Sequence, residues 1–329
     1  MNKNARIFVA GHRGLVGSAI VRRLRALRFD NLALRTHSEV DLADPAATRQ
    51  FFETERPEFV IVAAAKVGGI HANNTLPGTF IHTNLAIQTN VLHEAWRAGV
   101  ERLLFLGSSC IYPRECPQPI KEDYLLTGQL EPTNSAYAVA KIAGIEMCRS
   151  YNRQYGTRFL AAMPTNMYGP GDNFDLETSH VLPALLRKTI EAAQRGEDEV
   201  VIWGTGQPRR EFLHSDDLAD GCVMLLSLDT ETFDDFLSSH YYPLINIGYG
   251  EDLTIAELAH LIARKVGYQG RLRFDSSRPD GTMRKLMDSS RMRTLGWKPK
   301  INLEQGIEKM IDRLRSQFPT PRTKRAAAG

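Results

Sequence analysis

The sequence predicts an α/β fold in which a doubly wound parallel sheet is covered by helices on both faces. Three observations predict it. Short runs of β-branched and aromatic residues alternate with amphipathic stretches over the first half of the chain. These runs are apolar throughout, which is typical of parallel strands buried on both faces. A glycine-rich turn joins the first run to the first amphipathic stretch.

The elements of the first half follow from this alternation. Right-handed crossovers join the expected strands into one sheet. We expect strands at residues 6–10, 32–35, 59–65, 103–106 and 159–163, with helices at residues 16–27 and 84–98.

The pattern changes after residue 171 and predicts a smaller α/β lobe. We expect a first domain at residues 1–170, to which residues 212–248 return, and a second lobe at residues 171–211 and 249–318. The basic tail at residues 319–329 lacks apolar periodicity. The expected elements here are a strand at residues 200–203 and helices at residues 182–194, 216–228, 254–266 and 303–315.

Composition excludes several classes of protein. The chain has 329 residues, 43% of them hydrophobic and 24% charged, which is ordinary for a globular protein. A net charge of +3 gives no argument for nucleic-acid binding. Without an apolar run of about 18 residues or a signal peptide we expect no membrane segment. Four cysteines without CxxC spacing predict reduced thiols in the cytoplasm and no metal site.

The glycine-rich turn predicts a dinucleotide site of the Rossmann type. Gly11, Gly14 and Gly17 permit a tight turn, close approach of the backbone to a pyrophosphate, and close packing of helix on sheet. The helix N-terminus adds unpaired N–H groups and the positive end of its dipole. A turn that is merely structural is the alternative.

The cofactor preference follows from two arginines. NAD-binding proteins usually carry Asp or Glu at the end of the second strand. This strand instead ends at Arg35, and Arg13 lies inside the turn. Guanidinium groups suit a phosphate, so we infer NADP(H), with two solvated surface arginines as the alternative. Asp41 and Leu42 follow at a spacing suited to the adenine side.

Ser108, Tyr137 and Lys141 form a candidate catalytic group. Ser108 follows an expected strand, at the sheet edge where α/β folds bind ligands. Tyr137 and Lys141 are four residues apart on an expected helix and therefore share a face. A nearby ammonium would lower the pKa of the phenol, and the serine would hydrogen-bond a substrate carbonyl. A buried helix face with an incidental tyrosine would not explain the lysine.

These motifs resemble those of the extended short-chain dehydrogenases/reductases. The resemblance covers about residues 5–315 and is closer to the members that act on a GDP-linked 4-keto-6-deoxy sugar. It is carried by AGHRGLVGS (10–18), AAAKVGGI (63–70), GSSCIYP (107–113), EPTN (131–134), YAVAKIAG (137–144), MPTNMYGP (163–170), REFLH (210–214) and PDGT (279–282).

The resemblance implies inversion at carbons 3 and 5 of the sugar and NADPH-dependent reduction of the ketone at carbon 4. A ketone acidifies the flanking C–H bonds, so each inversion needs a base and an acid on opposite faces of the ring. Cys110 and His180 fall at the acid–base positions of these relatives. Without the resemblance, a packing cysteine and an ordinary histidine would be the simpler interpretation.

The resemblance also assigns binding residues. His37 and Lys188 stand where some relatives carry Arg, which leaves the strength of the NADP preference open. The implied substrate contacts are Lys188, Trp203, Arg210 and, more weakly, Asp280. The implied cofactor contacts are Gly11, His12, Arg13, Gly14, Leu15, Val16, Gly17, Arg35, His37, Asp41, Leu42, Leu106, Ser108, Ser109, Lys141, Pro164, Asn166, Met167 and His180.

Other functions remain as alternatives. A nucleotide-sugar 4-epimerase or 4,6-dehydratase would share the fold, but a dehydratase needs an acidic pair where this chain has the thiol of Cys110. A non-catalytic NADP(H)-sensing scaffold would not need Ser108, Tyr137 and Lys141 together. By analogy with the family, we expect a homodimer that pairs through the helices at residues 84–98 and 137–151.

Overall fold

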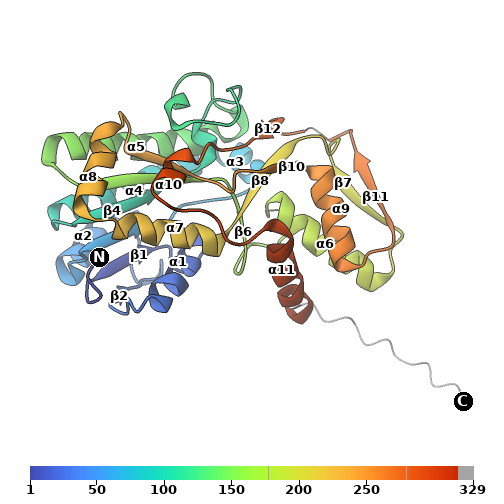
Figure 1. The fold of residues 1–329 in the computed structure, drawn as a ribbon, viewed down its shortest axis with the longest axis horizontal. Helices are drawn as coiled ribbons and strands as arrows, with labels where there is room; N and C mark the ends of the chain where they lie inside the picture. Colours follow the sequence, from blue (N-terminus) through green and yellow to red (C-terminus); the bar gives the residue numbers. More distant parts are fainter. Residues whose placement is uncertain (177, 279, 318–329) are drawn as a thin grey trace, which may run out of the picture.

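Two lobes make up the structure, a computed structural model that describes residues 1–176, 178–278 and 280–317. The first lobe holds the N-terminus and a central sheet, and the second contains α6 (Val181–Arg195) and α9 (Ile255–Val266) (Figure 1). The expected tail at residues 319–329 lies outside the described residues. Within the described residues, no helix has both the length and the apolar character needed to cross a bilayer.

Six strands form one parallel sheet, which confirms the predicted doubly wound architecture. Their order is β2-β1-β3-β4-β5-β9, and every neighbouring pair is parallel. β9 comes from a late segment that returns to the sheet beside β5. The strands are β1 (Ile7–Ala10), β2 (Leu32–Ala33), β3 (Phe59–Val62), β4 (Arg102–Leu106), β5 (Phe159–Pro164) and β9 (Leu244–Ile247).

Helices cover both faces of this sheet (Figure 1). Strand residues alternate between two cores: Ile7 and Val9 belong to one, and Phe8 and Ala10 to the other. The first core is closed by α1 (Leu15–Ala26), α7 (Ser215–Ser227) and α8 (Thr230–Ser239). The second is closed by α2 (Pro45–Glu55), α4 (Pro77–Arg97) and α5 (Ser135–Tyr155). This arrangement leaves the carboxyl ends of the strands, where ligands bind in such folds, facing the second lobe.

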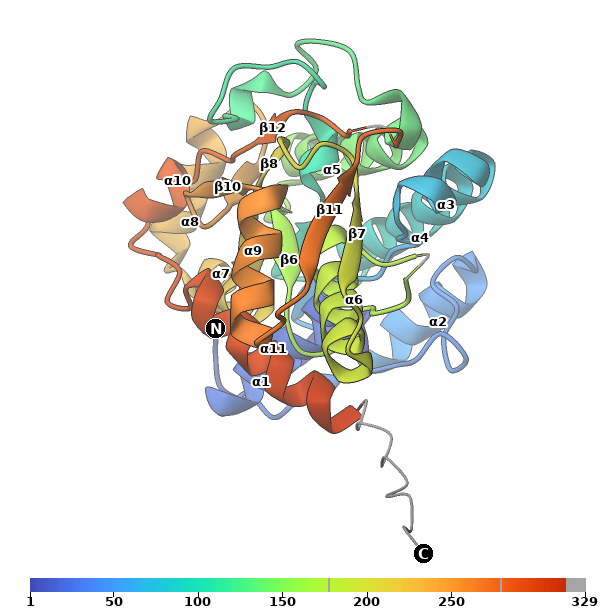
Figure 2. The same ribbon diagram turned by 90° about the vertical axis from the view of Figure 1, so that its right-hand side faces the viewer.

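The second lobe packs three helices beside a two-stranded parallel sheet (Figure 2). The apolar faces of these helices enclose Leu186, Leu258, Ile262 and Ile307. The elements are α6, α9, α11 (Leu303–Gln317), β7 (Glu199–Trp203) and β11 (Arg271–Asp275).

A small sheet around β8 joins the two lobes. β8 (Arg209–His214) pairs with β6 (Asn166–Tyr168), β10 (Asp252–Thr254) and β12 (Arg284–Lys285). The fully buried carboxylate of Glu211 accepts the N–H groups of Gly250 at 2.6 Å and Met287 at 3.0 Å. The remaining short elements are α3 (Ile70–Thr75), α10 (Ser290–Thr294) and the 3₁₀ turns η1 (Ser109–Ile111), η2 (Glu122–Tyr124) and η3 (Pro132–Asn134).

Candidate active site

At two positions of the junction between β1 and α1, Gly11 and Gly17, only glycine fits. Gly11 has a φ of 79°, and a Cβ there would lie 2.7 Å from the backbone nitrogen of Ala64. A Cβ on Gly17 would collide with the carbonyl oxygen of Gly11. Gly14 is the N-cap of α1, so the N-terminal N–H groups of the helix follow it directly. The turn therefore has the close backbone approach that a pyrophosphate requires.

The basic groups beside this turn have carboxylate neighbours. Arg35 forms an ion pair with Glu55, whereas exposed Arg13 has no ion pair within the described residues. Hydrogen bonds from Thr36, followed by the charges of Arg35 and Arg13, lower the pKa of Glu39. A 2′-phosphate at this position would have to compete with these carboxylates for Arg35.

Other predicted cofactor residues lie around the same turn. The Nδ1 atom of His12 is buried and has no hydrogen-bond partner in the described part of the chain. Burial, with the nearby Arg13, lowers the pKa of His12. His37 is exposed and its Nδ1 lies 3.5 Å from a carboxylate oxygen of Asp41, while Leu42 is buried. The unpartnered His12 nitrogen is free to bind a ligand at the turn.

Ser108 lies where β4 ends and η1 begins. Its hydroxyl oxygen caps η1 by accepting the backbone N–H of Cys110 at 3.5 Å. The neighbouring Ser109 is buried, and the carbonyl of Leu106 accepts a hydrogen bond from Lys141 Nζ at 2.9 Å. The carboxyl end of β4 is thereby tied directly to α5.

Tyr137 and Lys141 share one face of α5, as the spacing predicts. Lys141 Nζ lies 5.7 Å from the centroid of the Tyr137 ring and 4.7 Å from that of Phe105. Burial lowers the pKa of Lys141 to about 8. Burial, and then the neighbouring Cys110, raise the pKa of Tyr137, which differs from the expected lowering by Lys141. The phenol therefore holds its proton and can act as an acid.

Cys110 lies beside these groups and is 5% exposed. Burial raises the pKa of its thiol, against a hydrogen bond with Ser108 and the charges of Lys285 and Lys141. The structure thus brings together the predicted residues Ser108, Cys110, Tyr137 and Lys141. Sequence reasoning missed Lys285, because a single lysine in a short polar stretch carries no signal.

His180 lies at the start of the second lobe as the N-cap of α6. Its surface is exposed, yet desolvation by the surrounding protein lowers the pKa of its imidazole. The segment before it lies against the loop that precedes α3, since a Cβ on Gly69 would be 3.3 Å from the carbonyl oxygen of Thr178. Phe80 connects that loop to Tyr137 through an edge-to-face contact with ring centroids 6.4 Å apart.

The other predicted cofactor residues follow β5. Pro164 ends β5, and Asn166 and Met167 begin β6. The side-chain amide of Asn166 donates to the carbonyl of Glu211 at 2.9 Å, which fixes β6 against β8. These residues lie next to the junction of the two lobes.

Of the predicted substrate residues, Lys188 on α6 and Trp203 on β7 lie in the second lobe, and Arg210 lies on β8 in the sheet that joins the lobes. Trp203 is 64% exposed at the end of β7 and contacts two cations, Lys188 at 5.4 Å and Arg278 at 5.0 Å from its ring. Arg278 was not predicted. Asp280 instead accepts hydrogen bonds from the backbone N–H of Thr205 at 2.9 Å and from its hydroxyl at 2.6 Å, so it holds the turn after β7.

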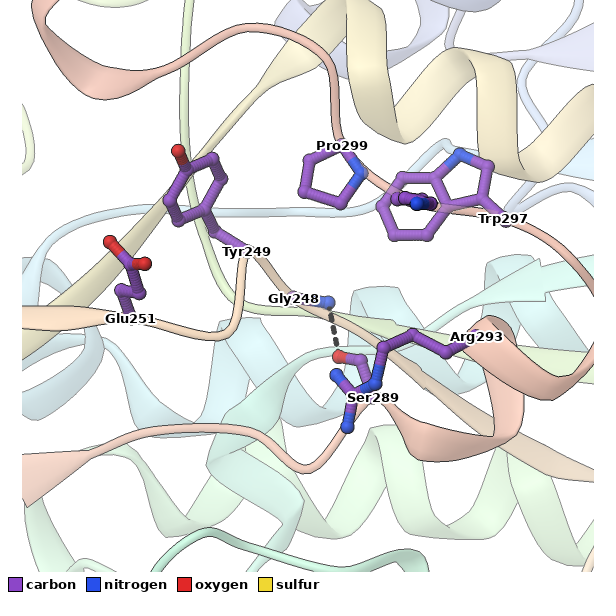
Figure 3. A pocket seen from close by; sticks show the side chains of 8 residues that line it. Gly248, Tyr249, Glu251, Ser289, Arg293, Trp297 and Pro299 are labelled. Atoms are coloured by element: carbon purple, nitrogen blue, oxygen red, sulfur yellow. Dashed lines mark hydrogen bonds between the residues drawn. The ribbon is translucent and has the colours of Figure 1, made fainter.

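A separate cavity of about 230 Å³ opens beside β9 and α10 (Figure 3). At its floor the Gly248 N–H donates to the Ser289 hydroxyl at 2.8 Å. None of the predicted site residues lines this cavity. Its lining consists of Gly248, Tyr249, Glu251, Ser289, Arg293, Trp297, Lys298 and Pro299.

Known proteins resemble the chain over nearly its whole length. It is 57% identical to GDP-L-fucose synthase 1 of Arabidopsis thaliana, with 94% of this chain and 93% of that protein covered. It is 52% identical to the GDP-L-fucose synthase of Escherichia coli strain K12, over 92% and 94% of the two chains. The crystal structure of a GDP-L-fucose synthetase from Naegleria fowleri bound to NADP matches with a TM-score of 0.83 at 28% identity, covering 98% of both chains.

The family model that describes the NAD dependent epimerase/dehydratase family matches residues 7–236. This segment contains the glycine turn, Ser108, Tyr137 and Lys141. The chain therefore belongs to the NAD dependent epimerase/dehydratase family, in which its similarity is to the GDP-L-fucose synthases.

Proposed function

We propose that this chain converts GDP-4-dehydro-6-deoxy-D-mannose to GDP-L-fucose, by inversion at carbons 3 and 5 and reduction of the 4-keto group with NADPH. The observation that carries the proposal is the convergence of Ser108, Cys110, Tyr137 and Lys141 at the carboxyl end of β4. The names of the similar proteins support the substrate.

The reduction needs one proton at the ketone oxygen. NADPH, when bound, supplies the hydride to the carbonyl carbon. The Ser108 hydroxyl orients the carbonyl by hydrogen bonding, and the Tyr137 phenol delivers the proton. The Lys141 ammonium then stabilises the phenolate that remains, since its charge is held within the same buried region.

Each inversion needs a proton removed from one face of the ring and returned on the other. Burial keeps the Cys110 thiol protonated and the His180 imidazole neutral, so one can give a proton and the other can take one. One inversion leaves a thiolate and an imidazolium, and proton transfer in the reverse direction restores both groups.

We propose NADP(H) as the cofactor, held by the glycine turn and by Arg13 and Arg35. A Cβ on Gly11 or Gly17 would collide with neighbouring backbone, so these glycines keep the turn tight. Gly14 is exposed at the N-terminus of α1, which supports a close approach of the pyrophosphate there. Replacing Arg35 with Ala should narrow the preference for NADPH over NADH, because only the 2′-phosphate distinguishes the cofactors. Equal affinity of the wild type for both in a titration would reject this assignment.

The proposed substrate contacts are Lys188, Trp203 and Arg210. The exposed Trp203 ring between two cations suits a stacked base next to phosphates. Asp280 acts through the turn that it holds rather than through the substrate, because both of its oxygens bind Thr205.

We also propose that the chain forms a homodimer through α4 and α5 and works in the cytoplasm. Val139 is 45% exposed on α5, and Ala143 continues the same outer face one turn later. All four cysteines are free thiols, which suits a reducing compartment.

The test is incubation with GDP-4-dehydro-6-deoxy-D-mannose and NADPH in deuterated water. We expect loss of NADPH absorbance, and mass spectrometry and NMR should show deuterium at carbons 3 and 5 of GDP-L-fucose. The variant Cys110→Ser should suppress the exchange, since a hydroxyl is a much weaker acid than a thiol. A product with unchanged stereochemistry would indicate a plain reductase. Net regeneration of the cofactor would favour an epimerase or dehydratase, and no turnover would favour the scaffold.

A further inference from the structure

The two faces of β12 differ in how their cations are paired. In the parallel register with β8, Arg284 is opposite Arg209 and Lys285 is opposite Arg210, so each pair shares a face. The Arg209–Arg284 face is neutralised, because both guanidinium groups bind the carboxylate of Asp252, that of Arg209 at 2.9 Å.

The opposite face carries Arg210 and Lys285 without such a partner. Both are half-buried, and neither forms an ion pair within the described residues. Burial lowers the pKa of both groups. The charge of Asp280 opposes this lowering at Arg210, and the charges of Cys110 and then Glu131 oppose it at Lys285, where Arg210 adds to it. Two adjacent cations without a bound carboxylate are costly, so this face is built to meet negative charge.

Cys110 is a group on which the charge of Lys285 acts. β12 leads into Met287, which bridges to Ile120 and packs in the same core as Ile111 of η1. The Leu286 N–H also donates to Gln118 Oε1 at 2.9 Å, and the Leu286 carbonyl accepts the Ile120 N–H at 2.7 Å. The segment that carries Lys285 is therefore bonded to the loop that follows Cys110. The charge of Lys285 lowers the pKa of the Cys110 thiol more than the charge of Lys141 does. In turn, no other charged group changes the pKa of Lys285 more than Cys110.

We propose that Lys285 is a positioning residue whose ammonium stabilises the Cys110 thiolate, and so supports the inversions but not the reduction. The inference rests on the proposed function of Cys110 as an acid–base group. When Cys110 takes a proton from a ring carbon, the C–H bond breaks and an S–H bond forms. When it donates, the reverse occurs. The thiolate is present at one end of either transfer, and the Lys285 ammonium stabilises it without itself giving or taking the proton.

The other groups around the thiol define what the ammonium adds. Ser108 hydrogen-bonds the sulfur, and Lys141 and Tyr137 approach from α5. Lys141 already donates to the Leu106 carbonyl, whereas Lys285 Nζ has no hydrogen bond within the described residues. Lys285 is therefore the cation that can turn toward the sulfur.

The test is the pH dependence of Cys110 alkylation by iodoacetamide in the protein without substrate. A Cys116→Ser background removes the other accessible thiol, since Cys148 and Cys222 are fully buried. Lys285→Met should slow alkylation about tenfold at a given pH, as a shift of about one pKa unit requires. Lys285→Arg should restore most of the rate, because it keeps the charge.

Two activity measurements accompany the alkylation. The Lys285→Met substitution should slow deuterium exchange at the ring carbons about tenfold. The same variant should oxidise GDP-L-fucose with NADP⁺ at nearly the wild-type rate, because that reaction needs no inversion. Arg284→Met is the matched control on the neutralised face of the same strand. It should leave both the exchange rate and the oxidation rate unchanged. Lys285→Gln replaces the Met variant if the latter fails to fold.

The possible outcomes separate the two hypotheses. The inference about Lys285 is overturned if Lys285→Met leaves the pH profile of alkylation unchanged, or if Lys285→Arg slows alkylation as much as Lys285→Met does. In either case, turnover by the wild-type protein leaves the proposed function intact. A shifted profile together with a wild type that neither exchanges nor reduces the sugar supports the Lys285–Cys110 coupling and rejects the proposed function.

Discussion

Protonation of individual residues is set here by burial more than by neighbouring charges. Burial raises the pKa of Tyr137 and Cys110 and lowers that of Lys141 and His180. Each of these groups is thereby neutral or close to losing its charge at neutral pH. The site therefore starts with two proton donors, a phenol and a thiol, and one acceptor, an imidazole.

Tyr137→Phe should reduce the rate of ketone reduction by about 10²–10⁴-fold, because it removes a positioned proton donor. NADPH affinity should stay nearly unchanged, since the phenol oxygen makes no hydrogen bond to the glycine turn. Stopped-flow absorbance and a fluorescence titration of NADPH measure the two effects. Turnover by the Phe variant close to that of the wild type would show that another group protonates the ketone.

The rate of reduction should fall as the pH rises through about 8, the pKa to which burial lowers Lys141. Below this value the ammonium is charged and stabilises the phenolate, and above it this stabilisation is lost. Lys141→Arg should move the falling limb to higher pH, since a guanidinium does not titrate in this range. A limb at the same pH in both proteins would assign it to a different group.

At the scale of single elements, the junction of β1 and α1 tolerates no side chain at Gly11 or Gly17. Gly17→Ala should weaken NADPH binding and destabilise the fold by about 1–3 kcal/mol, because the added Cβ meets the Gly11 carbonyl. Gly78→Ala in α4 is the control: its Cβ would have no atom within 4 Å, and the loss of glycine should stabilise the helix by about 0.5–1 kcal/mol. Thermal unfolding with and without NADPH measures both.

The sequence predicts these elements to different extents. The strands of the main sheet are apolar runs with their own signal, and their type is confirmed, although β2 is shorter than expected. α4 begins at Pro77 rather than at residue 84, because the residues before 84 (PGTFIHT) are mostly polar or small and show no apolar periodicity. Asn84 itself is buried and bonded to the backbone of Lys66. Periodicity cannot show a buried amide that replaces an apolar contact.

The sequence predicted the site residues that belong to local motifs. It missed those that reach the site only through the pairing of strands far apart in the sequence. Ser108, Tyr137 and Lys141 have fixed spacings, so their convergence follows from the fold. Lys285 enters the site only because β12, two residues long, pairs with β8. Strands this short have no sequence pattern of their own.

At the scale of the whole molecule, the chain passes between the lobes several times. The small sheet around β8 takes strands from segments far apart in the sequence, and the buried carboxylate of Glu211 ties two of them together. The residues at the junction therefore depend on both lobes for their placement.

Association of two copies gives a prediction at this scale. Val139→Lys should shift the protein from dimer to monomer, because a charge would be buried on the apolar outer face of α5. Leu126→Lys, at a site 59% exposed outside α4 and α5, is the control and should leave the mass unchanged. Sedimentation velocity measures the outcome, and a monomeric wild type or a dimeric Val139→Lys variant would contradict the proposed interface.

The late return of β9 and α7 to the first sheet has a consequence for synthesis on the ribosome. When the first 170 residues have emerged, α1 alone covers the face of the sheet that α7 and α8 later share, and β5 is an open edge. The nascent protein must make much of the second lobe before it can finish the first. Translation that stops between the two would leave an apolar surface and an unpaired strand exposed to chaperones or to aggregation. The N-terminal domain therefore cannot be produced as an independent cassette by ending the gene after residue 170.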